Sequence, residues 1–263
     1  MIYELNHFGI VVKDLQKSID FYQNVLGAKV VYRGFIPGNK TDVIYLLITG
    51  GMVELLHRAD AGPDEKFGIT HIAFMTDDLE GDYARLIDAG NEGLVAPRVA
   101  GSGAGRLAFL RDPNGTRVEL LQRDIAMRDE PVKHDIIKAF DHYSLFVKDR
   151  DAAVNFYKTL LGMKELKRLQ VASTGLDMTY LNYDYDVLEL LTRPGDAPDD
   201  IYLHFALRVD DIDKAMEAFA AHGLTPLPGT PRPAATGLGR VVMYADPDGV
   251  KFEIVDRADL RTL

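Results

Sequence analysis

Short runs of apolar residues with single polar residues at alternate positions recur along the chain, a pattern typical of β-strands with two different faces. The clearest case is Asn6-His7-Phe8-Gly9-Ile10-Val11-Val12. Because successive side chains of a strand point to opposite faces, Phe8 and Ile10 share one face, while His7 and Gly9 share the other. The sequence therefore predicts a strand with one apolar face and one face on which a histidine stands beside a small residue.

A helix and three more strands follow this first strand. Apolar residues recur at helical spacing between Leu15 and Leu26, after Asp14, which can cap a helix, and before Gly27, which can end one. Three strands are then predicted, at residues 28–33, 42–48 and 52–56. The first unit of the chain is thus β-α-β-β-β.

This unit occurs four times along the chain. The His7 strand recurs at His142, and weaker copies contain His71 and His204. Regular self-similarity of this kind predicts a protein made of equivalent modules. The modules span residues 1–58, 69–123, 139–193 and 201–263.

One unit covers only one face of its sheet with a helix, so two units must combine to bury a core. We therefore predict an α+β fold in which four βαβββ modules pair into two curved eight-stranded half-barrel domains, with the histidines facing the hollows. The domains span residues 1–123 and 139–263, joined by a linker at 124–138. The repeat leaves two pairings open: modules one with two and three with four, or one with four and two with three.

Composition narrows the class of protein. The chain has 263 residues, 47% hydrophobic and 27% charged, which is ordinary for a globular protein with a substantial core. It has no cysteine, which excludes disulfides, thiolate metal ligands and a cysteine nucleophile. The net charge of −10 argues against a nucleic-acid partner. We see no secretion signal and no apolar run of membrane-spanning length, so we expect a cytoplasmic protein without a membrane partner.

The last strand of each module carries one glutamate in an apolar run. An ionised carboxylate buried there needs a cation or strong hydrogen bonds. Two modules together offer two imidazoles and two carboxylates, a set that suits Zn, Ni, Co, Mn or Fe(II) and does not suit calcium. The candidate ligands are His7, Glu54, His71 and Glu119 in the first half and His142, Glu189, His204 and Glu253 in the second. An alternative without a metal is that the glutamates lie in a solvent-exposed row of charged residues along a strand edge. An arginine follows each glutamate by four residues: Arg58, Arg123, Arg193 and Arg257.

Arginines flank two loops rich in glycine and alanine, and they are candidates for binding a substrate carboxylate or phosphate. Arg98 and Arg232 each follow a proline, and Arg106 and Arg240 each open a strand. The alternative role for all four is a salt bridge that anchors the loop. Two tyrosines, Tyr45 and Tyr180, stand nine residues before their glutamates and either face the hollow or belong to the core.

The motifs resemble those of the vicinal oxygen chelate superfamily, which includes glyoxalase I, methylmalonyl-CoA epimerase, fosfomycin resistance proteins and extradiol dioxygenases. The resemblance lies in the His7 strand with Asp14-Leu15, the turn Asp112-Pro113-Asn114-Gly115 with Glu119, and the copies of these motifs in the second half. It implies that the eight histidines and glutamates are metal ligands, in a set similar to that of glyoxalase I. It also assigns the role of catalytic base to Glu119 and Glu253. Small bacterial glyoxalase I enzymes hold a glutathione carboxylate with an arginine four residues after the first histidine, and here Arg208 alone has that spacing from a module histidine.

The resemblance implies a divalent-metal-dependent lyase, isomerase or epimerase that acts on a small oxygenated carbonyl compound by stabilising an enediolate. An Fe(II) extradiol-type ring-cleaving dioxygenase is a second possibility, and a binding or resistance protein for an aromatic small molecule is a third. We expect a monomer or a homodimer, a small-molecule substrate and no organic cofactor.

Overall fold

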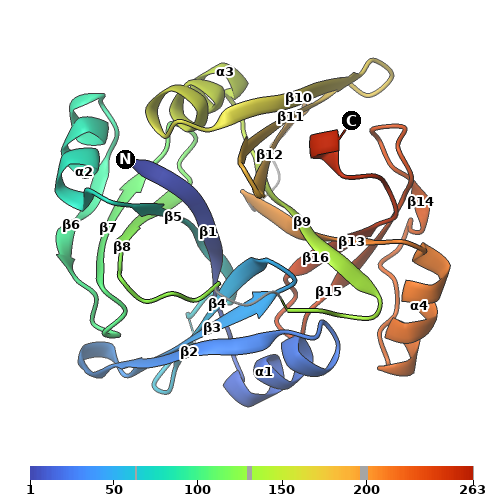
Figure 1. The fold of residues 1–263 in the computed structure, drawn as a ribbon, viewed down its shortest axis with the longest axis horizontal. Coiled ribbons are helices and arrows are strands. Elements are labelled where there is room, and N and C mark those ends of the chain that lie inside the picture. Colours follow the sequence, from blue (N-terminus) through green and yellow to red (C-terminus); the bar gives the residue numbers. More distant parts are fainter. Residues whose placement is uncertain (63, 129–131, 196–200, 263) are drawn as a thin grey trace.

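The computed structural model describes residues 1–62, 64–128, 132–195 and 201–262, which form two eight-stranded sheets (Figure 1). The strands of the first sheet are β1 (Ile2–Val11), β2 (Lys29–Ile36), β3 (Thr41–Ile48), β4 (Gly51–Arg58), β5 (Gly68–Thr76), β6 (Gly93–Val99), β7 (Arg106–Arg111) and β8 (Arg117–Gln122). Those of the second are β9 (Ile137–Phe146), β10 (Lys164–Val171), β11 (Leu176–Tyr183), β12 (Asp186–Thr192), β13 (Tyr202–Val209), β14 (Arg232–Pro233), β15 (Arg240–Ala245) and β16 (Lys251–Val255).

The strand order shows which modules pair. It is β2-β3-β4-β1-β5-β8-β7-β6 in the first sheet and β10-β11-β12-β9-β13-β16-β15-β14 in the second. The first module therefore pairs with the second, and the third with the fourth. The predicted fold of paired half-barrels is confirmed, and the pairing that the repeat left open is the one in chain order. β9 begins at Ile137, two residues before the predicted start of the second domain.

One helix follows the first strand of every module, as the apolar spacing predicts. They are α1 (Leu15–Asn24), α2 (Leu79–Asp88), α3 (Arg150–Val154), which continues into the π-helical turn η2 (Asn155–Leu160), and α4 (Ile212–Ala221). The side chain of Asp14 accepts a hydrogen bond from the backbone N–H of Lys17 at 3.1 Å, which confirms it as the cap of α1. Short 3₁₀ turns complete the structure at η1 (Pro37–Asn39) and η3 (Leu260–Thr262).

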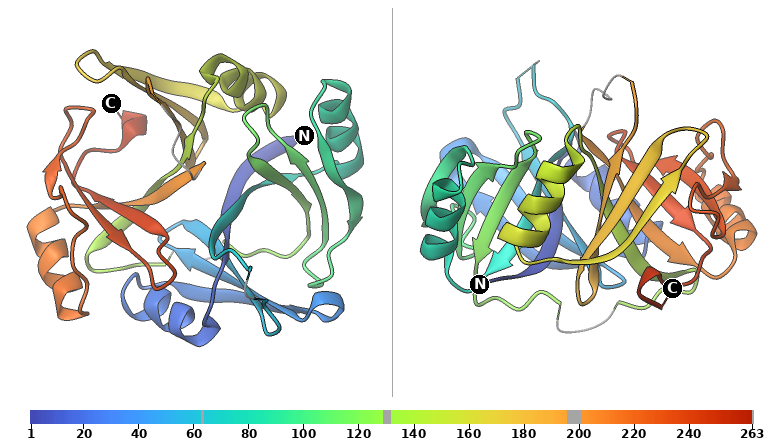
Figure 2. Two further views of the ribbon diagram at one scale, coloured as in Figure 1. Left: turned by 180° about the vertical axis from the view of Figure 1, so that it is seen from behind. Right: turned by 90° about the horizontal axis from the view of Figure 1, so that it is seen from above.

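The two sheets stand back to back, and their concave faces point away from each other (Figure 1). Helices α1 and α3 lie between the sheets, whereas α2 and α4 cover the outer flanks (Figures 1 and 2). One continuous apolar core fills the space between the sheets and includes residues of both domains. The rings of Phe8 and Tyr143, for example, have centroids 4.9 Å apart across the domain boundary. The core therefore belongs to the whole molecule rather than to either domain.

The two Asp-Pro-x-Gly turns hold the domains together. In the first, the N–H of Gly115 donates to the backbone oxygen of Asp112 at 3.0 Å, the bond expected of the predicted turn. The Asp112 carboxylate accepts a 2.9 Å hydrogen bond from the Tyr157 hydroxyl of the other domain. Asp246 accepts the equivalent 2.9 Å bond from Tyr22. Each turn thus docks on the first helix of the opposite domain, an arrangement that we call the reciprocal turn contacts.

The fourth module departs most from the repeat. Its second strand, β14, has only two residues, and one of them is Pro233. Proline has no N–H to donate to a neighbouring strand, so Pro231 and Pro233 limit the pairing of this segment with β15. The sheet edge is therefore shorter here than at β6, its counterpart in the first domain.

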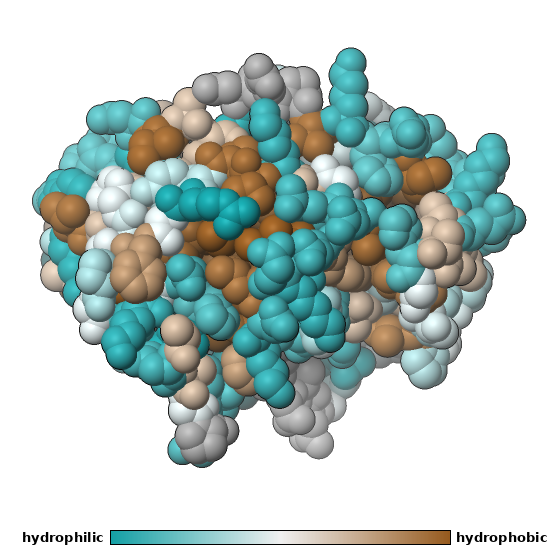
Figure 3. Space-filling view, turned by 90° about the horizontal axis from the view of Figure 1, so that it is seen from below, coloured by the Kyte–Doolittle hydropathy of each residue, from teal (hydrophilic) through white to brown (hydrophobic). Residues whose placement is uncertain are grey.

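The surface is mainly polar. Seen from below, hydrophilic side chains cover most of the molecule, and hydrophobic side chains gather towards the middle of this face (Figure 3). Among the described residues, no helix is both long and apolar enough to cross a lipid bilayer.

Candidate metal centre

The antiparallel pair at the middle of each sheet brings two histidines together. In the first domain, His7 of β1 lies opposite Ala73 of β5, and His71 lies opposite Gly9. A Cβ atom at Gly9 would lie 1.8 Å from Cε1 of His71. The small residue that the sequence places beside each histidine thus faces the histidine of the neighbouring strand.

The outer neighbours of these strands supply the carboxylates. β4 runs parallel to β1 and places Glu54 beside Gly9, and β8 runs parallel to β5 and places Glu119 beside Ala73. The Nε2 atoms of His7 and His71 are 3.3 Å apart. Oε2 of Glu54 lies 3.5 Å and 3.3 Å from these two nitrogens, and Oε2 of Glu119 lies 3.5 Å and 3.2 Å from them. All four predicted residues of the first half therefore meet at one point.

The buried carboxylates and imidazoles at this point stabilise each other's charged forms. Burial raises the pKa of Glu54, but the close imidazoles of His7 and His71 outweigh this effect and hold the pKa well below the usual range. Burial lowers the pKa of His71, but Glu119 and Glu54 raise it to about 9. The pKa of Glu119 is also lowered, because the two imidazoles outweigh the effect of burial. Burial alone would raise the pKa of Glu119, so the imidazoles reverse the effect of its apolar setting.

These residues fit a small divalent cation. Ligand atoms about 2.0–2.2 Å from one ion are spaced about 3.0–3.5 Å from one another, which matches the distances between the imidazoles and carboxylates. All four ligand atoms lie within 4.8 Å of one another. In addition, Oε2 of Glu119 is buried and accepts no hydrogen bond from a described residue. The nitrogen and oxygen donors suit Zn, Ni, Co, Mn or Fe(II).

A second layer of residues orients the first histidine of each domain. Nδ1 of His7 lies 2.9 Å from Oδ1 of Asn6, which also accepts a 2.7 Å hydrogen bond from Arg123. Because that amide oxygen can only accept, Nδ1 of His7 carries the proton and Nε2 is left to bind a metal. Sequence reasoning missed both partners. The available signal was the shared Glu-x-x-x-Arg spacing, whose interpretation as a solvated charge row fails at Arg123, which contacts Asn6 inside the domain.

The equivalent residues of the second domain form a looser group. The Nε2 atoms of His142 and His204 are again 3.3 Å apart, but Oε2 of Glu189 lies 3.7 Å and 3.9 Å from them. Oε2 of Glu253 is 4.0 Å from His204 and lies outside the group of three mutually close ligands. Asp141 takes the place of Asn6, 2.7 Å from Nδ1 of His142, and Arg257 contacts it.

Hydrogen bonds explain why the second group is looser. Both oxygens of Glu189 are engaged, one by the hydroxyl of Ser144 at 2.5 Å and the other by that of Tyr180 at 2.6 Å. Burial raises the pKa of Glu253 to about 7, the rise that Glu119 lacks. Burial also lowers the pKa of His204 to about 4. Both oxygens of Glu189 therefore already accept hydrogen bonds from neighbouring hydroxyls. Glu253 has less positive charge close to it than Glu119 has.

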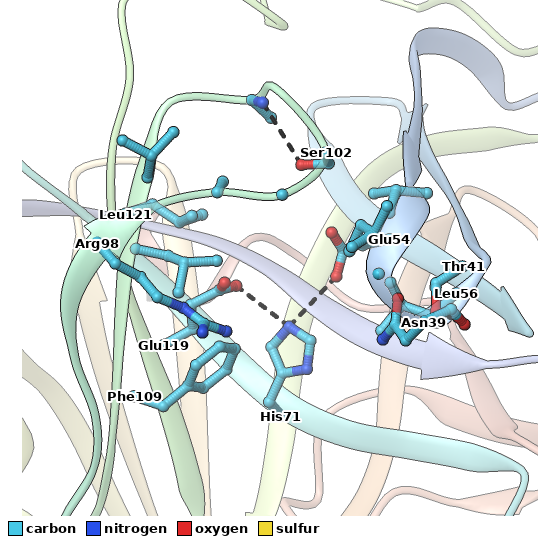
Figure 4. A pocket seen from close by; sticks show the side chains of 18 of the residues that line it. Asn39, Thr41, Glu54, Leu56, His71, Arg98, Ser102, Phe109, Glu119 and Leu121 are labelled. Atoms are coloured by element: carbon cyan, nitrogen blue, oxygen red, sulfur yellow. Dashed lines mark hydrogen bonds and ion pairs between the residues drawn. The ribbon is translucent and has the colours of Figure 1, made fainter.

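The hollows also differ in size. The first contains a cavity of about 500 Å³ whose walls are largely apolar, from residues such as Val43, Leu56, Leu107, Phe109 and Leu121. The carboxyl groups of Glu54 and Glu119 point at the ring of His71 on its floor (Figure 4). The cavity of the second hollow measures about 100 Å³. The first hollow thus has much more room than the second for an organic molecule beside the histidines and glutamates.

The other predicted site residues are divided between the hollows and the outer surface. Tyr45 and Tyr180 are buried and face the first and second hollow, and the exposed Arg98 and Arg232 line the same two cavities. Arg106 and Arg240 instead form ion pairs with Glu80 and Asp213, and Arg208 lies 2.9 Å from Asp259. Neither cavity includes these last three residues. Their carboxylate partners belong to the protein, which argues against the predicted substrate contact.

Comparison with known proteins agrees with this architecture. Residues 4–120 and 139–254 match the family profile described as "Glyoxalase/Bleomycin resistance protein/Dioxygenase superfamily". The chain is 29% identical to "Lactoylglutathione lyase GLX1" of Arabidopsis thaliana, over 96% of this chain and 91% of that protein. It is 34% identical to "Ethylmalonyl-CoA/methylmalonyl-CoA epimerase" of Cereibacter sphaeroides, over 46% of this chain and 99% of the epimerase.

A solved structure shares the fold. The Mn(II)-bound glyoxalase of Novosphingobium aromaticivorans superimposes with a TM-score of 0.69 at 21% identity, covering 98% of this chain and 84% of that one. Since the family profile matches both halves of the sequence, the chain belongs to the glyoxalase, bleomycin resistance protein and dioxygenase superfamily.

Proposed function

We propose that the protein is a divalent-metal-dependent lyase, isomerase or epimerase that acts on a small oxygenated carbonyl compound in the hollow of the first domain. One observation carries the proposal. Four buried ligand atoms, from His7, Glu54, His71 and Glu119, surround a common point: the two imidazole nitrogens are 3.3 Å apart, and each lies 3.2–3.5 Å from both carboxylate oxygens. The relatives named as a lactoylglutathione lyase and as a CoA-ester epimerase support the same reaction classes.

Each part of the first hollow has a role in this proposal. A divalent ion held by the four ligands would act as a Lewis acid on two adjacent substrate oxygens and stabilise the charge that develops when a proton leaves the neighbouring carbon. His7 and His71 hold their Nε2 atoms towards this position. In this proposal the Glu119 carboxylate accepts the proton on the oxygen that does not bind the ion and returns it to the product. The apolar walls exclude water from the reacting carbon.

The second domain is proposed as the weaker metal site. Its Glu189 already accepts hydrogen bonds at both oxygens, and the His–Glu distances are 3.7–4.0 Å. A metal would have to displace the hydroxyls of Ser144 and Tyr180 to bind this carboxylate fully. Its cavity of about 100 Å³ also leaves little room for a substrate.

The test is metal content per chain, measured on the purified protein and on two matched variants. We expect about one tightly bound equivalent in the native protein. His7→Ala should lose it, whereas the equivalent substitution His142→Ala should retain it. Full metal content in His7→Ala, or loss in His142→Ala alone, would contradict the assignment to the first domain.

A ring-cleaving Fe(II) dioxygenase is the second candidate. The observation that favours it is the three-residue group His142, Glu189 and His204, because two histidines and one carboxylate are the ligands typical of non-haem Fe(II) oxygenases. Protein reconstituted anaerobically with Fe(II) and then mixed with catechol would consume oxygen if this candidate holds. Lack of oxygen uptake by iron-loaded protein would exclude it for catechol.

A further inference from the structure

We propose that Arg117 binds an anionic group of the substrate, so that the first domain selects small organic anions with a carboxylate or phosphate a few bonds from the oxygens that chelate the metal. The inference rests on the proposed function of the first hollow and adds the substrate class. Neither the repeat nor the arginine spacing pointed to this residue.

Arg117 lies close to the proposed reaction site. It stands on β8 two residues before Glu119, so both side chains lie on the concave face of the sheet. Both line the cavity of about 500 Å³, together with His71. A group bound by the guanidinium would therefore share the cavity with a group bound at the metal position.

The guanidinium is held in place but not neutralised. Its Cζ atom lies 3.8 Å from the centre of the Phe109 ring, which supports the flat face of the cation. Arg117 forms no ion pair with any residue of the described chain, whereas neighbouring arginines do: Arg58 pairs with Glu65, Arg106 with Glu80 and Arg111 with Glu92. A half-buried arginine without a carboxylate partner retains donors for a ligand.

The charges of the hollow favour an anion once the metal is present. The two carboxylates of Glu54 and Glu119 carry two negative charges, which a divalent cation balances. The positive charge of Arg117 is then not balanced by a carboxylate inside a cavity with mainly apolar walls, whereas Arg98, which also lines the cavity, is exposed to solvent. Charges interact more strongly there than in water, so a carboxylate or phosphate is the group that this position stabilises best.

The second domain fixes the backbone at this position. The hydroxyl of Tyr202 accepts a 3.1 Å hydrogen bond from the N–H of Arg117 and lies 3.2 Å from its backbone oxygen. The same hydroxyl donates to the backbone oxygen of Thr70, next to His71, at 2.9 Å. Tyr202 thus ties the strand of Arg117 to the strand of the metal-site histidine, which keeps the two parts of the cavity at a constant separation.

A pair of metal chelators of equal carbon-chain length tests the inference by binding rather than by turnover. Succinate monohydroxamate carries a carboxylate, and butanohydroxamate is its neutral counterpart with a methyl group. Both would be titrated into Mn²⁺-loaded native protein, Arg117→Met and Lys251→Met by calorimetry. Lys251 is the matched control, because it holds the position of Arg117 in the second domain and is exposed.

We expect native protein and Lys251→Met to bind the charged chelator about tenfold more tightly than the neutral one. Arg117→Met should remove this preference and leave the affinity for butanohydroxamate within about twofold, which would also show that the variant is folded. Arg117→Lys, which keeps the charge but loses the planar fork, should show an intermediate preference.

Failure of the role proposed for Arg117 can be distinguished from failure of the proposed metal-dependent function. If both chelators bind native protein equally, or if the preference persists in Arg117→Met, the role of Arg117 is refuted while the metal site stands. If neither chelator binds because no Mn²⁺ is held, the proposed function itself fails, and the substrate class fails with it.

Discussion

Gly9 and Ser144 occupy equivalent positions, each opposite the second histidine of its domain. In the first domain, the missing side chain leaves space for the ring of His71, and both nearby glutamates reach the histidines. In the second, the Ser144 hydroxyl binds Glu189 at 2.5 Å. A difference of one small side chain thus accompanies the change from a compact to a loose group of potential ligands.

Gly9→Ala should therefore disrupt the proposed metal site of the first domain. The new Cβ atom would lie 1.8 Å from Cε1 of His71, so the ring would have to move away from Glu54 and Glu119. We expect metal affinity at this site to fall by about 100-fold or more, a loss comparable to that of a displaced ligand. Calorimetric titration measures it. Native affinity in Gly9→Ala would show that His71 is not a ligand.

Ser144→Gly should have the opposite effect on the second site. Without the hydroxyl, Oε2 of Glu189 loses its hydrogen-bond donor and becomes free to bind a metal between His142 and His204. We expect metal affinity there to rise by about tenfold, as expected when one competing hydrogen bond to a charged group is removed. The measurement is best made in a His7→Ala background, where the first site is disabled. An unchanged affinity would mean that Tyr180 alone restrains Glu189.

The repeat predicted the eight histidines and glutamates because equivalent positions kept the same residue types, and the structure brings the first four together. It did not predict the inequality between the two halves, which depends on the hydroxyl of Ser144 and on distances of a few tenths of an ångström. Arg117 was missed for a different reason. Its distinguishing property, the lack of a carboxylate partner, depends on which acidic residues the fold places nearby, and sequence spacing does not give this.

Among the structural elements, the Asp-Pro-x-Gly turns have a larger role than reversing the chain. Oδ1 of Asp246 accepts backbone N–H bonds from Asp248 and Val250 within the turn, and its other oxygen receives the Tyr22 hydroxyl of α1. Burial raises the pKa of Asp246 to about 6. Asp112 has the same kind of partners, and burial also raises its pKa.

Asp246→Asn should change how stability depends on pH. The carboxyl group has a higher pKa in the folded state than in the unfolded state, where it is about 3.9. Its contribution is complete below about pH 4 and is lost as the pH rises through about 6. Relative to Asp246→Asn, which keeps an oxygen acceptor, the native protein should lose on the order of 1–3 kcal/mol of unfolding free energy across this window. Urea unfolding at several pH values measures the difference, and parallel curves for the two proteins would contradict the prediction.

The sequence predicted helices and strands well where their formation depends on residues close together in the chain. The cap at Asp14 and the strands of the first module lie where the apolar spacing places them. The order of strands in the sheets could not be derived, because modules of the same shape pair equally well in either combination until their contacting faces are known. The strand β6 was not located either, since Gly93, Pro97 and the bulged pairing with β7 break the alternation.

The molecule as a whole should unfold as one unit. The main core runs without interruption from Phe8 and Phe74 in one domain to Tyr143 and Phe205 in the other. We expect a single calorimetric transition whose calorimetric and van 't Hoff enthalpies agree, although the chain contains two domains. Tyr22→Phe and Tyr157→Phe, which each remove one reciprocal turn contact, should lower stability by about 1–2 kcal/mol without splitting the transition. Two separate transitions in the native protein would show that each domain is stable alone.

Through the reciprocal turn contacts, the two halves of this one polypeptide are joined in the way that two subunits of a twofold-symmetric dimer are joined. In a homodimer, any substitution appears in both subunits, so a change that moves the ligand residues apart in one site does the same in the other. In this chain a substitution changes only one half, although the two halves remain in contact. One hollow can carry Ser144, Asp141 and a small cavity while the other keeps Gly9, Asn6 and a large one, and the altered half still serves its neighbour by holding Arg117 through Tyr202.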